Sequence, residues 1–440
     1  MKEKIIKLKN GGILVYSKSK LNNCSAVEAG FFAGAYNENK IGTAHLCEHT
    51  LFKKTKNRDN LQIENDRNEI VFINASTSLD YLTVNFFRSN KLIKESMELA
   101  EDVLMNSIID DEYLETEKGV VVEELNMCLD SESRDVYVHN LRQSQTKAKF
   151  ASDIVGRTSE EISKIEFKDL LQFKNDYFVG NNFVVSVTTP LSLFKVRRLV
   201  NKYFVEKIPY KKESKQPKNY FKDLVIDKES SLSIVNNNQD KITVLLSFKL
   251  DLNELDLIKD LNYSFLAKYF SGAQGDLFLK LRNKGLIYRF FSDYSCFSKD
   301  SLFNIVFETS KEKIKDILEI VKEDIYNIVN NSVPQKYIDS YKKNFDYFND
   351  ERMPVRMSYT CHKNLVEYLY FGKLIKVNNR QRKKYKNNVT IDNIKTAANK
   401  FFNKNTKMFV TVLGNITEEY VPKFDYFKEN FLISEENLNG

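Results

Sequence analysis

The chain has 440 residues, enough for two or three ordinary domains with large apolar cores. Its 67 basic and 60 acidic residues give a formal net charge of +7, but this charge is dispersed and no nucleic-acid-binding motif accompanies it. We therefore expect no nucleic-acid partner. Because the sequence lacks an apolar run near the roughly 18 residues that a membrane span needs, we also expect no transmembrane helix.

The first half predicts strands and helices in irregular alternation. Gly12 to Tyr16 and Ala26 to Gly34 are apolar and partly alternating, which favours paired strands. The β-branched and aromatic stretch from Ile70 to Arg88 predicts two more strands. Helical periodicity follows at 92–109 and 113–129, and a short apolar strand is expected at 183–188. This order favours an α+β fold over a regular parallel sheet.

A Lys-rich segment near the middle of the chain is the predicted linker. Residues 207–230 contain Pro209 and Pro217 and few apolar side chains before Leu224. The linker separates two stretches related by an offset of 224: Tyr113-Leu-Glu-Thr-Glu-Lys corresponds to Tyr337-Ile-Asp-Ser-Tyr-Lys. An aromatic pair before FVVSV likewise corresponds to one before MFVTV. We therefore expect two tandem homologous domains, at 1–210 and 225–440, joined by a linker at 211–224.

Five cysteines, an odd number spread along the chain, argue against a disulfide framework. The basic start MKEKIIKLKNGGILVYSKSK lacks both the apolar core of a signal peptide and the Arg/Ser-rich character of a transit sequence. These two features predict a cytoplasmic protein.

The segment TAHLCEHTLFKKT, from Thr43 to Thr55, carries two of the four histidines. On a helix, His45 and His49 project from one face, and Glu48 lies on the same face. Neutral imidazoles suit Zn²⁺, and a nearby carboxylate can take a proton from the attacking water. The H-x-x-E-H pattern therefore predicts hydrolysis with Glu48 as general base, although three residues could also fall at this spacing by chance.

A catalytic zinc needs a third protein ligand, and a carboxylate is the best candidate. The helix EKGVVVEELNM presents Glu117 and Glu124 seven residues apart on one face, so that one could bind zinc while the other orients a ligand. The alternative is that both are solvated surface glutamates. The offset of 224 places Tyr269, Gly272 and Ala273 opposite the H-x-x-E-H residues, so this pattern exists in the first half only.

These residues together resemble the pitrilysin-type zinc metallopeptidases, particularly the short members that include mitochondrial and bacterial processing peptidases. The resemblance covers nearly the whole chain and rests on KLKNGGILVYS, GAYNENKIGTAHLCEHTLFKKTKNR and EKGVVVEELNM. It implies that His45, His49 and Glu124 bind one Zn²⁺ per chain and that Glu117 supports the site. It also implies a fold of two mostly antiparallel sheets flanked by helices, forming half of a clam-like chamber.

The resemblance assigns substrate contacts as well. Asn74 and Ala75 begin a segment similar to the family's N-A-x-T-S edge strand, to which a peptide adds as an extra strand. The segment LRNKGLIY is similar to the family's L-R-x-K-x-G-L-x-Y, in which the arginine and tyrosine stabilise the oxyanion. Here Arg282 and Tyr288 are six residues apart where the family usually has seven, which leaves their register open.

We therefore predict a zinc endopeptidase that cleaves unstructured peptides, leader peptides or presequences inside a dimeric chamber. The dimer could be a homodimer or a heterodimer with a related subunit. The alternative is a non-catalytic partner or scaffold subunit of a heterodimeric peptidase. Zinc content, and peptide cleavage by a Glu48 variant, distinguish these hypotheses.

Overall fold

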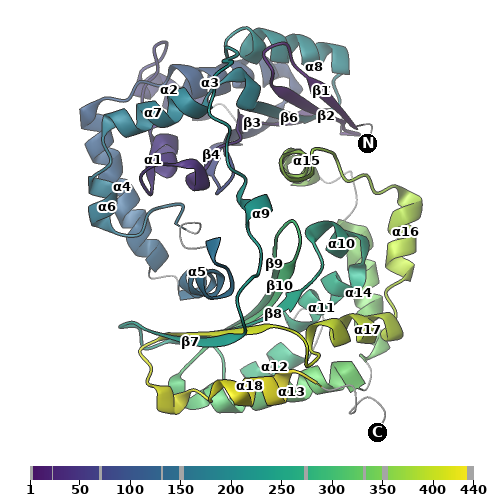
Figure 1. Cartoon of the computed structure of the whole chain (residues 1–440). Helices are drawn as coiled ribbons and strands as arrows, with labels where there is room; N and C mark the ends of the chain where they lie inside the picture. Colours follow the sequence, from purple (N-terminus) through teal and green to yellow (C-terminus); the bar gives the residue numbers. More distant parts are fainter. Residues whose placement is uncertain are drawn as a thin grey trace. The chain divides into compact units, whose positions relative to one another are not determined.

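The computed structural model describes residues 3–21, 23–68, 72–129, 132–147, 153–271, 276–330, 333–348 and 355–433. The predicted strand positions Ile70 and Val71, and the repeat positions Gly272 and Ala273, lie outside these ranges. Two units divide the chain: unit 1 holds residues 1–127, 150–220 and 349–375, and unit 2 holds 128–149, 221–348 and 376–440. Each unit is built on one sheet (Figure 1).

Unit 1 contains a six-stranded sheet in the order β1-β2-β6-β3-β5-β4. Only β2 and β6 run parallel, and the other neighbours are antiparallel. The strands are β1 Glu3–Lys7, β2 Ile13–Lys18, β3 Cys24–Phe31, β4 Phe72–Thr77, β5 Leu82–Ser89 and β6 Phe183–Thr189. The helices are α1 Thr43–Thr50, α2 Asn60–Asn68, α3 Ile93–Asn106, α4 Asp111–Leu129, α6 Ser159–Ser163, α7 Phe167–Tyr177, α8 Leu193–Val200 and α15 Val355–Phe371. Helix α9 Tyr220–Asp223 begins at the last residue of the 150–220 segment of unit 1 and continues in unit 2.

Unit 2 contains a five-stranded sheet in the order β7-β11-β8-β10-β9, which repeats the unit 1 order without β1. The pair β7 and β11 is parallel, as β2 and β6 are in unit 1. The strands are β7 Ser231–Asn236, β8 Ile242–Leu250, β9 Arg289–Cys296, β10 Ser301–Thr309 and β11 Met408–Gly414. The helices are α5 Glu132–Ser144, α10 Glu254–Lys259, α11 Leu261–Phe270, α12 Leu277–Asn283, α13 Ile314–Asn330, α14 Gln335–Phe348, α16 Asn379–Asn387, α17 Ile391–Phe401 and α18 Phe424–Phe431.

The two mostly antiparallel sheets with flanking helices confirm the predicted α+β class. The shared strand order agrees with the repeat seen in the sequence. In the unit 2 core, Phe303 on β10 stacks on Phe401 of α17, with ring centroids 4.7 Å apart, and both side chains are fully buried. Alternate residues of β8 face opposite sides of the sheet: Leu246 belongs to this core, whereas Leu245 packs with Val136 of α5.

Each unit also contains a helix from the other half of the sequence. Helix α15 packs on β6, β3 and β2 of unit 1, and α5 packs on β11, β8 and β7 of unit 2. An asparagine of each helix donates to a serine of the sheet: Asn140 of α5 donates to Ser247 Oγ of β8 at 3.0 Å, and Asn364 of α15 donates to Ser17 Oγ of β2 at 2.7 Å. Asn140 and Asn364 are separated by the same offset of 224 as the sequence repeat.

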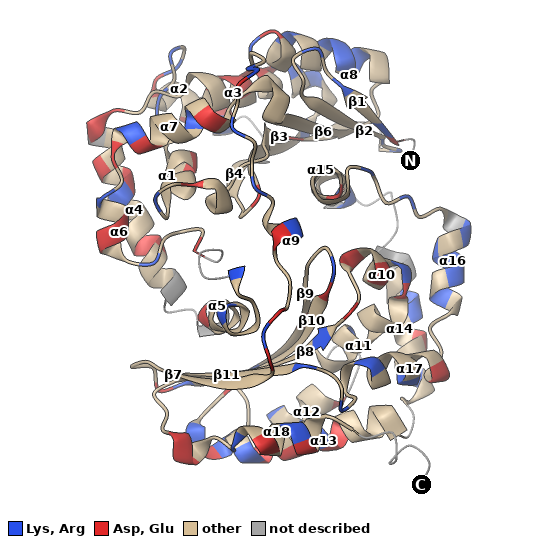
Figure 2. Ribbon diagram, viewed as in Figure 1, with Lys and Arg blue, Asp and Glu red and all other residues tan. Residues whose placement is uncertain are grey.

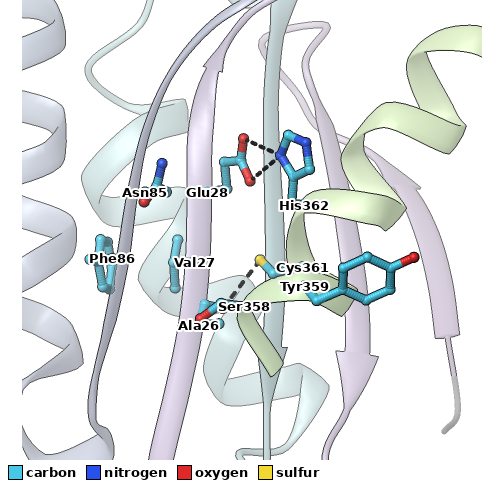
Figure 3. A pocket seen from close by; sticks show the side chains of 9 residues that line it. All are labelled: Ala26, Val27, Glu28, Asn85, Phe86, Ser358, Tyr359, Cys361 and His362. Atoms are coloured by element: carbon cyan, nitrogen blue, oxygen red, sulfur yellow. Dashed lines mark hydrogen bonds and ion pairs between the residues drawn. The ribbon is translucent and has the colours of Figure 1, made fainter. Parts of the chain in front are cut away.

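The contact between α15 and the sheet of unit 1 also contains an ion pair. His362 Nδ1 lies 3.1 Å from both carboxylate oxygens of Glu28 on β3, and Cys361 Sγ contacts the carbonyl oxygen of Ala26 at 3.5 Å (Figure 3). Glu28 is buried, and its hydrogen bond raises the pKa of His362 above the ordinary value. The sequence indicated no carboxylate partner for this histidine because the two residues are far apart in the chain.

Charged side chains of both signs alternate on most helices, in agreement with the dispersed charge of the sequence (Figure 2). Helices α8, α12 and α16 are among the exceptions because their charged residues are all basic. Among the described helices, none combines the length and apolar character needed to cross a bilayer.

Candidate metal centre

Helix α1 carries the H-x-x-E-H residues. Its position in unit 1 is fixed by the packing of its buried apolar side chains. Leu46 and Cys47 are fully buried, and the helix contacts α7 and β4. Burial raises the pKa of the Cys47 thiol to about 11, so that this residue acts as a small apolar side chain rather than as a competing thiolate. The helix ends at Thr50.

The N-terminus of α1 is fixed by a partly buried carboxylate. Gly42, the residue before the helix, has a left-handed φ of 91°, which favours glycine. Glu38 accepts hydrogen bonds from the backbone N–H groups of Gly42 and Ala44, each at 2.8 Å. It thereby pairs donors at the start of the helix that have no partner within it. Burial nevertheless raises the pKa of Glu38 to about 8.

Two histidines of α1 converge with a glutamate of α4. His49 Nε2 lies 3.3 Å from Glu124 Oε2 of α4, and His45 Nε2 lies 3.7 Å from the same oxygen. The two imidazole rings are inclined at 70°, with centroids 4.6 Å apart. Within the described residues, His45, His49 and Glu124 are the one group of His, Cys, Asp or Glu side chains whose donor atoms lie close enough to hold a metal, all within 4.8 Å of one another.

The spacing of these atoms fits zinc. Ligands about 2.0–2.1 Å from a tetrahedral ion lie roughly 3.3 Å from one another. The two distances to the Glu124 oxygen are 3.3 and 3.7 Å, so small side-chain adjustments would bring all three donors into such a shell. Two imidazoles and one carboxylate also match the ligand type of catalytic zinc, which leaves the fourth position for water or substrate.

Glu117 holds His49 from the side opposite to Glu124. Its Oε2 lies 3.1 Å from His49 Nδ1, and its Oε1 lies 2.8 Å from Lys53 Nζ. The Glu117 side chain is only 4% exposed, whereas that of Glu124 is 41% exposed. The surface-glutamate alternative is therefore wrong for Glu117, which faces the interior next to His49.

Glu48 lies on α1 next to His49, one of the three donor residues. Thr77 Oγ1 of β4 donates a hydrogen bond to Glu48 Oε2 at 2.9 Å. Burial raises the pKa of Glu48 above the ordinary value, although the Thr77 hydroxyl and nearby His49 partly offset this effect. The carboxylate is thus fixed in direction and only partly accessible to water.

The other predicted contacts fall in two places. Asn74, which is exposed, and Ala75, which is buried, lie on β4, the strand at one end of the unit 1 sheet. Strand β4 pairs with β5 and has no other neighbour in the sheet, so its outer edge lacks a partner strand among the described residues. Arg282, at the end of α12, and Tyr288, just before β9, are both exposed and belong to unit 2, so their relation to the metal centre remains a prediction.

Sequence reasoning missed three residues that hold the centre together: Glu38, Lys53 and Thr77. Each lies in a segment that the sequence had singled out, but no contact had been assigned to its side chain. Lys53 could have been found because it is a basic residue four positions after His49. Thr77 could have been found because it lies in the N-A-x-T-S segment.

Two family models match the chain. Residues 14–156 match the model described as Insulinase (Peptidase family M16), and residues 164–345 match the model described as Peptidase M16 inactive domain. The first match contains His45, His49 and Glu124, and the second contains none of them. The word inactive therefore refers to the half of the chain that lacks these donors.

Curated relatives agree with the models. A Rickettsia bellii protein named as an uncharacterized zinc protease is 24% identical over 377 residues, covering 84% of this chain and 88% of that protein. The mitochondrial-processing peptidase subunit beta of Bos taurus is 27% identical over 208 residues, a match that spans 46% of this chain and only 41% of the bovine subunit. Among solved structures, a protease from Helicobacter pylori has a TM-score of 0.77 at 20% identity, covering 94% of this chain and 99% of that one. The chain belongs to the pitrilysin-type M16 peptidase family.

Proposed function

We propose that this chain is a zinc-dependent endopeptidase that hydrolyses unstructured peptides, including leader or presequence segments. The observation that carries the proposal is the cluster formed by His45, His49 and Glu124, whose donor atoms lie within 4.8 Å of one another beside Glu48. The zinc protease from Rickettsia bellii, which matches over most of both chains, supports the same reaction class.

The residues of the metal centre have three different roles: metal binding, proton transfer and orientation of other side chains. His45, His49 and Glu124 would hold the ion, which when bound supplies a Lewis acid for amide hydrolysis. Glu48 takes a proton from the attacking water and later gives it to the leaving amine. Thr77 keeps the Glu48 carboxylate directed, and Glu117 keeps the His49 ring directed, through the hydrogen bonds described above.

Strand β4 provides a route for peptide binding. A substrate in an extended conformation can pair with its free edge through backbone hydrogen bonds, alongside Asn74 and Ala75. Such pairing depends little on side chains, which suits substrates of varied sequence. We further propose that Arg282 and Tyr288 contact the substrate carbonyl as the oxyanion develops.

We propose that the enzyme works as a homodimer or as a heterodimer with a related subunit, since the bovine relative is itself named as a subunit. The cysteines Cys24, Cys47, Cys296 and Cys361 carry free thiols. Free thiols support a reducing compartment such as the cytoplasm.

Metal analysis and one variant test the proposal. The purified protein should contain about one zinc per chain, because a single three-donor group is available among the described residues. Glu48→Gln should keep the zinc and lower cleavage of an unstructured peptide library by about 10²- to 10⁴-fold, the usual contribution of a general base. Undiminished turnover in Glu48→Gln would refute the assigned role.

A matched pair of histidine variants controls for non-specific metal binding. His49→Ala should lose the zinc because it removes one of three donors. His362→Gln should keep it, since His362 pairs with Glu28 away from the cluster. Wild-type protein that stays free of zinc after reconstitution would exclude the proposed function.

A further inference from the structure

Lys53 is connected to the metal centre through Glu117. Lys53 lies just after the end of α1, where the backbone N–H of Leu51 donates to the backbone carbonyl oxygen of Glu48 at 3.0 Å. The Lys53 ammonium lies 2.8 Å from Glu117 Oε1, and its side chain is 33% exposed. The sequence analysis assigned no role to Lys53 and did not predict its contact with Glu117 of α4.

The Glu117 carboxylate uses each oxygen for a different partner. Oε1 contacts Lys53 at 2.8 Å, and Oε2 contacts His49 Nδ1 at 3.1 Å. A carboxylate that is 4% exposed cannot satisfy its oxygens with bulk water, so its orientation depends on these two contacts. Removing Lys53 would leave one oxygen without its cation and would free the carboxylate to rotate away from His49.

The same ion pair joins the two helices that carry the donors. His45 and His49 stand on α1, whereas Glu124 stands on α4 two turns beyond Glu117. Nothing within either helix sets the distance between them. The contacts that Glu117 makes with His49 and Lys53 join the two helices near the end of α1.

We propose that Lys53 is a positioning residue of the metal centre: by holding Glu117, it fixes the His49 ring and the separation of α1 from α4. The inference rests on the proposed zinc binding. Lys53 touches neither the ion nor the substrate, so its contribution is preorganisation of the donors. Residues that orient metal ligands in this way typically change metal affinity by about 10- to 100-fold.

Zinc affinity of the full-length metal-free protein, measured by competition with a chromophoric chelator, tests this role without any activity assay. Lys53→Met, which keeps the length of the side chain but removes the charge, should weaken zinc binding about 10-fold. Lys53→Arg should restore affinity to within about 3-fold of wild type, because a guanidinium can also hold the carboxylate. Lys54→Met is the matched control, since Lys54 is the exposed neighbour in the chain.

The melting temperature of each metal-free variant separates positioning from folding. We expect Lys53→Met to fold but to melt a few degrees below wild type, since it leaves the buried Glu117 carboxylate without its cation. If Lys53→Met lowers the melting temperature further, Lys53→Gln provides the affinity comparison. If the uncharged variant binds zinc as tightly as wild type, or if Lys54→Met loses as much zinc affinity, the role of Lys53 is wrong, although the proposed function still stands. A wild-type chain without zinc affinity would overturn the proposed function as well.

Discussion

The hydrogen bond from Thr77 to Glu48 should contribute measurably to catalysis. Thr77→Val keeps the β-branched shape that suits strand β4 and removes only the hydroxyl that donates to Glu48 Oε2 at 2.9 Å. A hydrogen bond to a charged group contributes about 1.5 to 3 kcal/mol. The backbone N–H of Thr77 also bonds to Glu48 and is retained in the variant, so the lower part of this range applies. A loss of about 1.5 to 2 kcal/mol corresponds to a roughly 10- to 30-fold decrease in kcat/KM.

The assay is steady-state cleavage of a quenched fluorescent peptide by zinc-loaded protein, with the zinc content measured on the same samples. Thr77→Ser should recover most of the activity, because the serine hydroxyl can reach the same oxygen. Ser76→Ala controls for the strand, since the Ser76 hydroxyl lies 3.3 Å from Thr83 Oγ1 rather than near Glu48. Wild-type kcat/KM in Thr77→Val, or an equal decrease in Ser76→Ala, would show that the hydroxyl does not direct the general base.

Three further outcomes concern stability. Zinc at about 100 times its Kd should stabilise the wild-type chain by about 2.7 kcal/mol, seen as a higher melting temperature, whereas His49→Ala should show no such increase. In chelator-treated protein, the stability that His362 gains from Glu28 should be complete below a pH of about 6.5 and should disappear as the pH rises through its raised folded-state pKa. The difference in free energy of unfolding between wild type and His362→Gln, measured with denaturant, should therefore shrink by about 1 kcal/mol from pH 6 to pH 9. A difference that stays constant with pH would contradict this assignment. Phe303→Ala should lower the free energy of unfolding of unit 2 by about 3 to 5 kcal/mol in urea titrations, because it empties a fully buried ring site, and a loss below about 1 kcal/mol would argue against that packing.

Local patterns in the sequence predicted the central elements well. The spacing of His45, Glu48 and His49 has meaning only on a helix, and α1 is that helix. The strands at 12–16, 26–34 and 183–188 were visible because buried strands are rich in β-branched and apolar residues. Glu124 was predicted as the third ligand from the family resemblance, since spacing alone could not decide between it and Glu117.

Contacts between distant segments could not be predicted in the same way. The partner of His362 is Glu28, and that of Glu48 is Thr77, but periodicity shows only that a residue lies on a given face of its element. It does not show which other element covers that face. For the same reason, nothing in the sequence indicated that α5 and α15 each belong to the sheet formed mainly by the other half of the chain.

This exchange of α5 and α15 has a consequence for biosynthesis. A ribosome completes α5, which ends at Ser144, well before it reaches β7, β8 and β11, against which α5 packs. The sheet of unit 1 must in turn wait for α15, which begins at Val355. Folding therefore requires closure of long loops, a slow process that leaves sheet faces uncovered meanwhile. If the two halves were produced as separate polypeptides, each sheet would lack the helix that covers it, so we expect the halves to be recovered in soluble form only when they are expressed together.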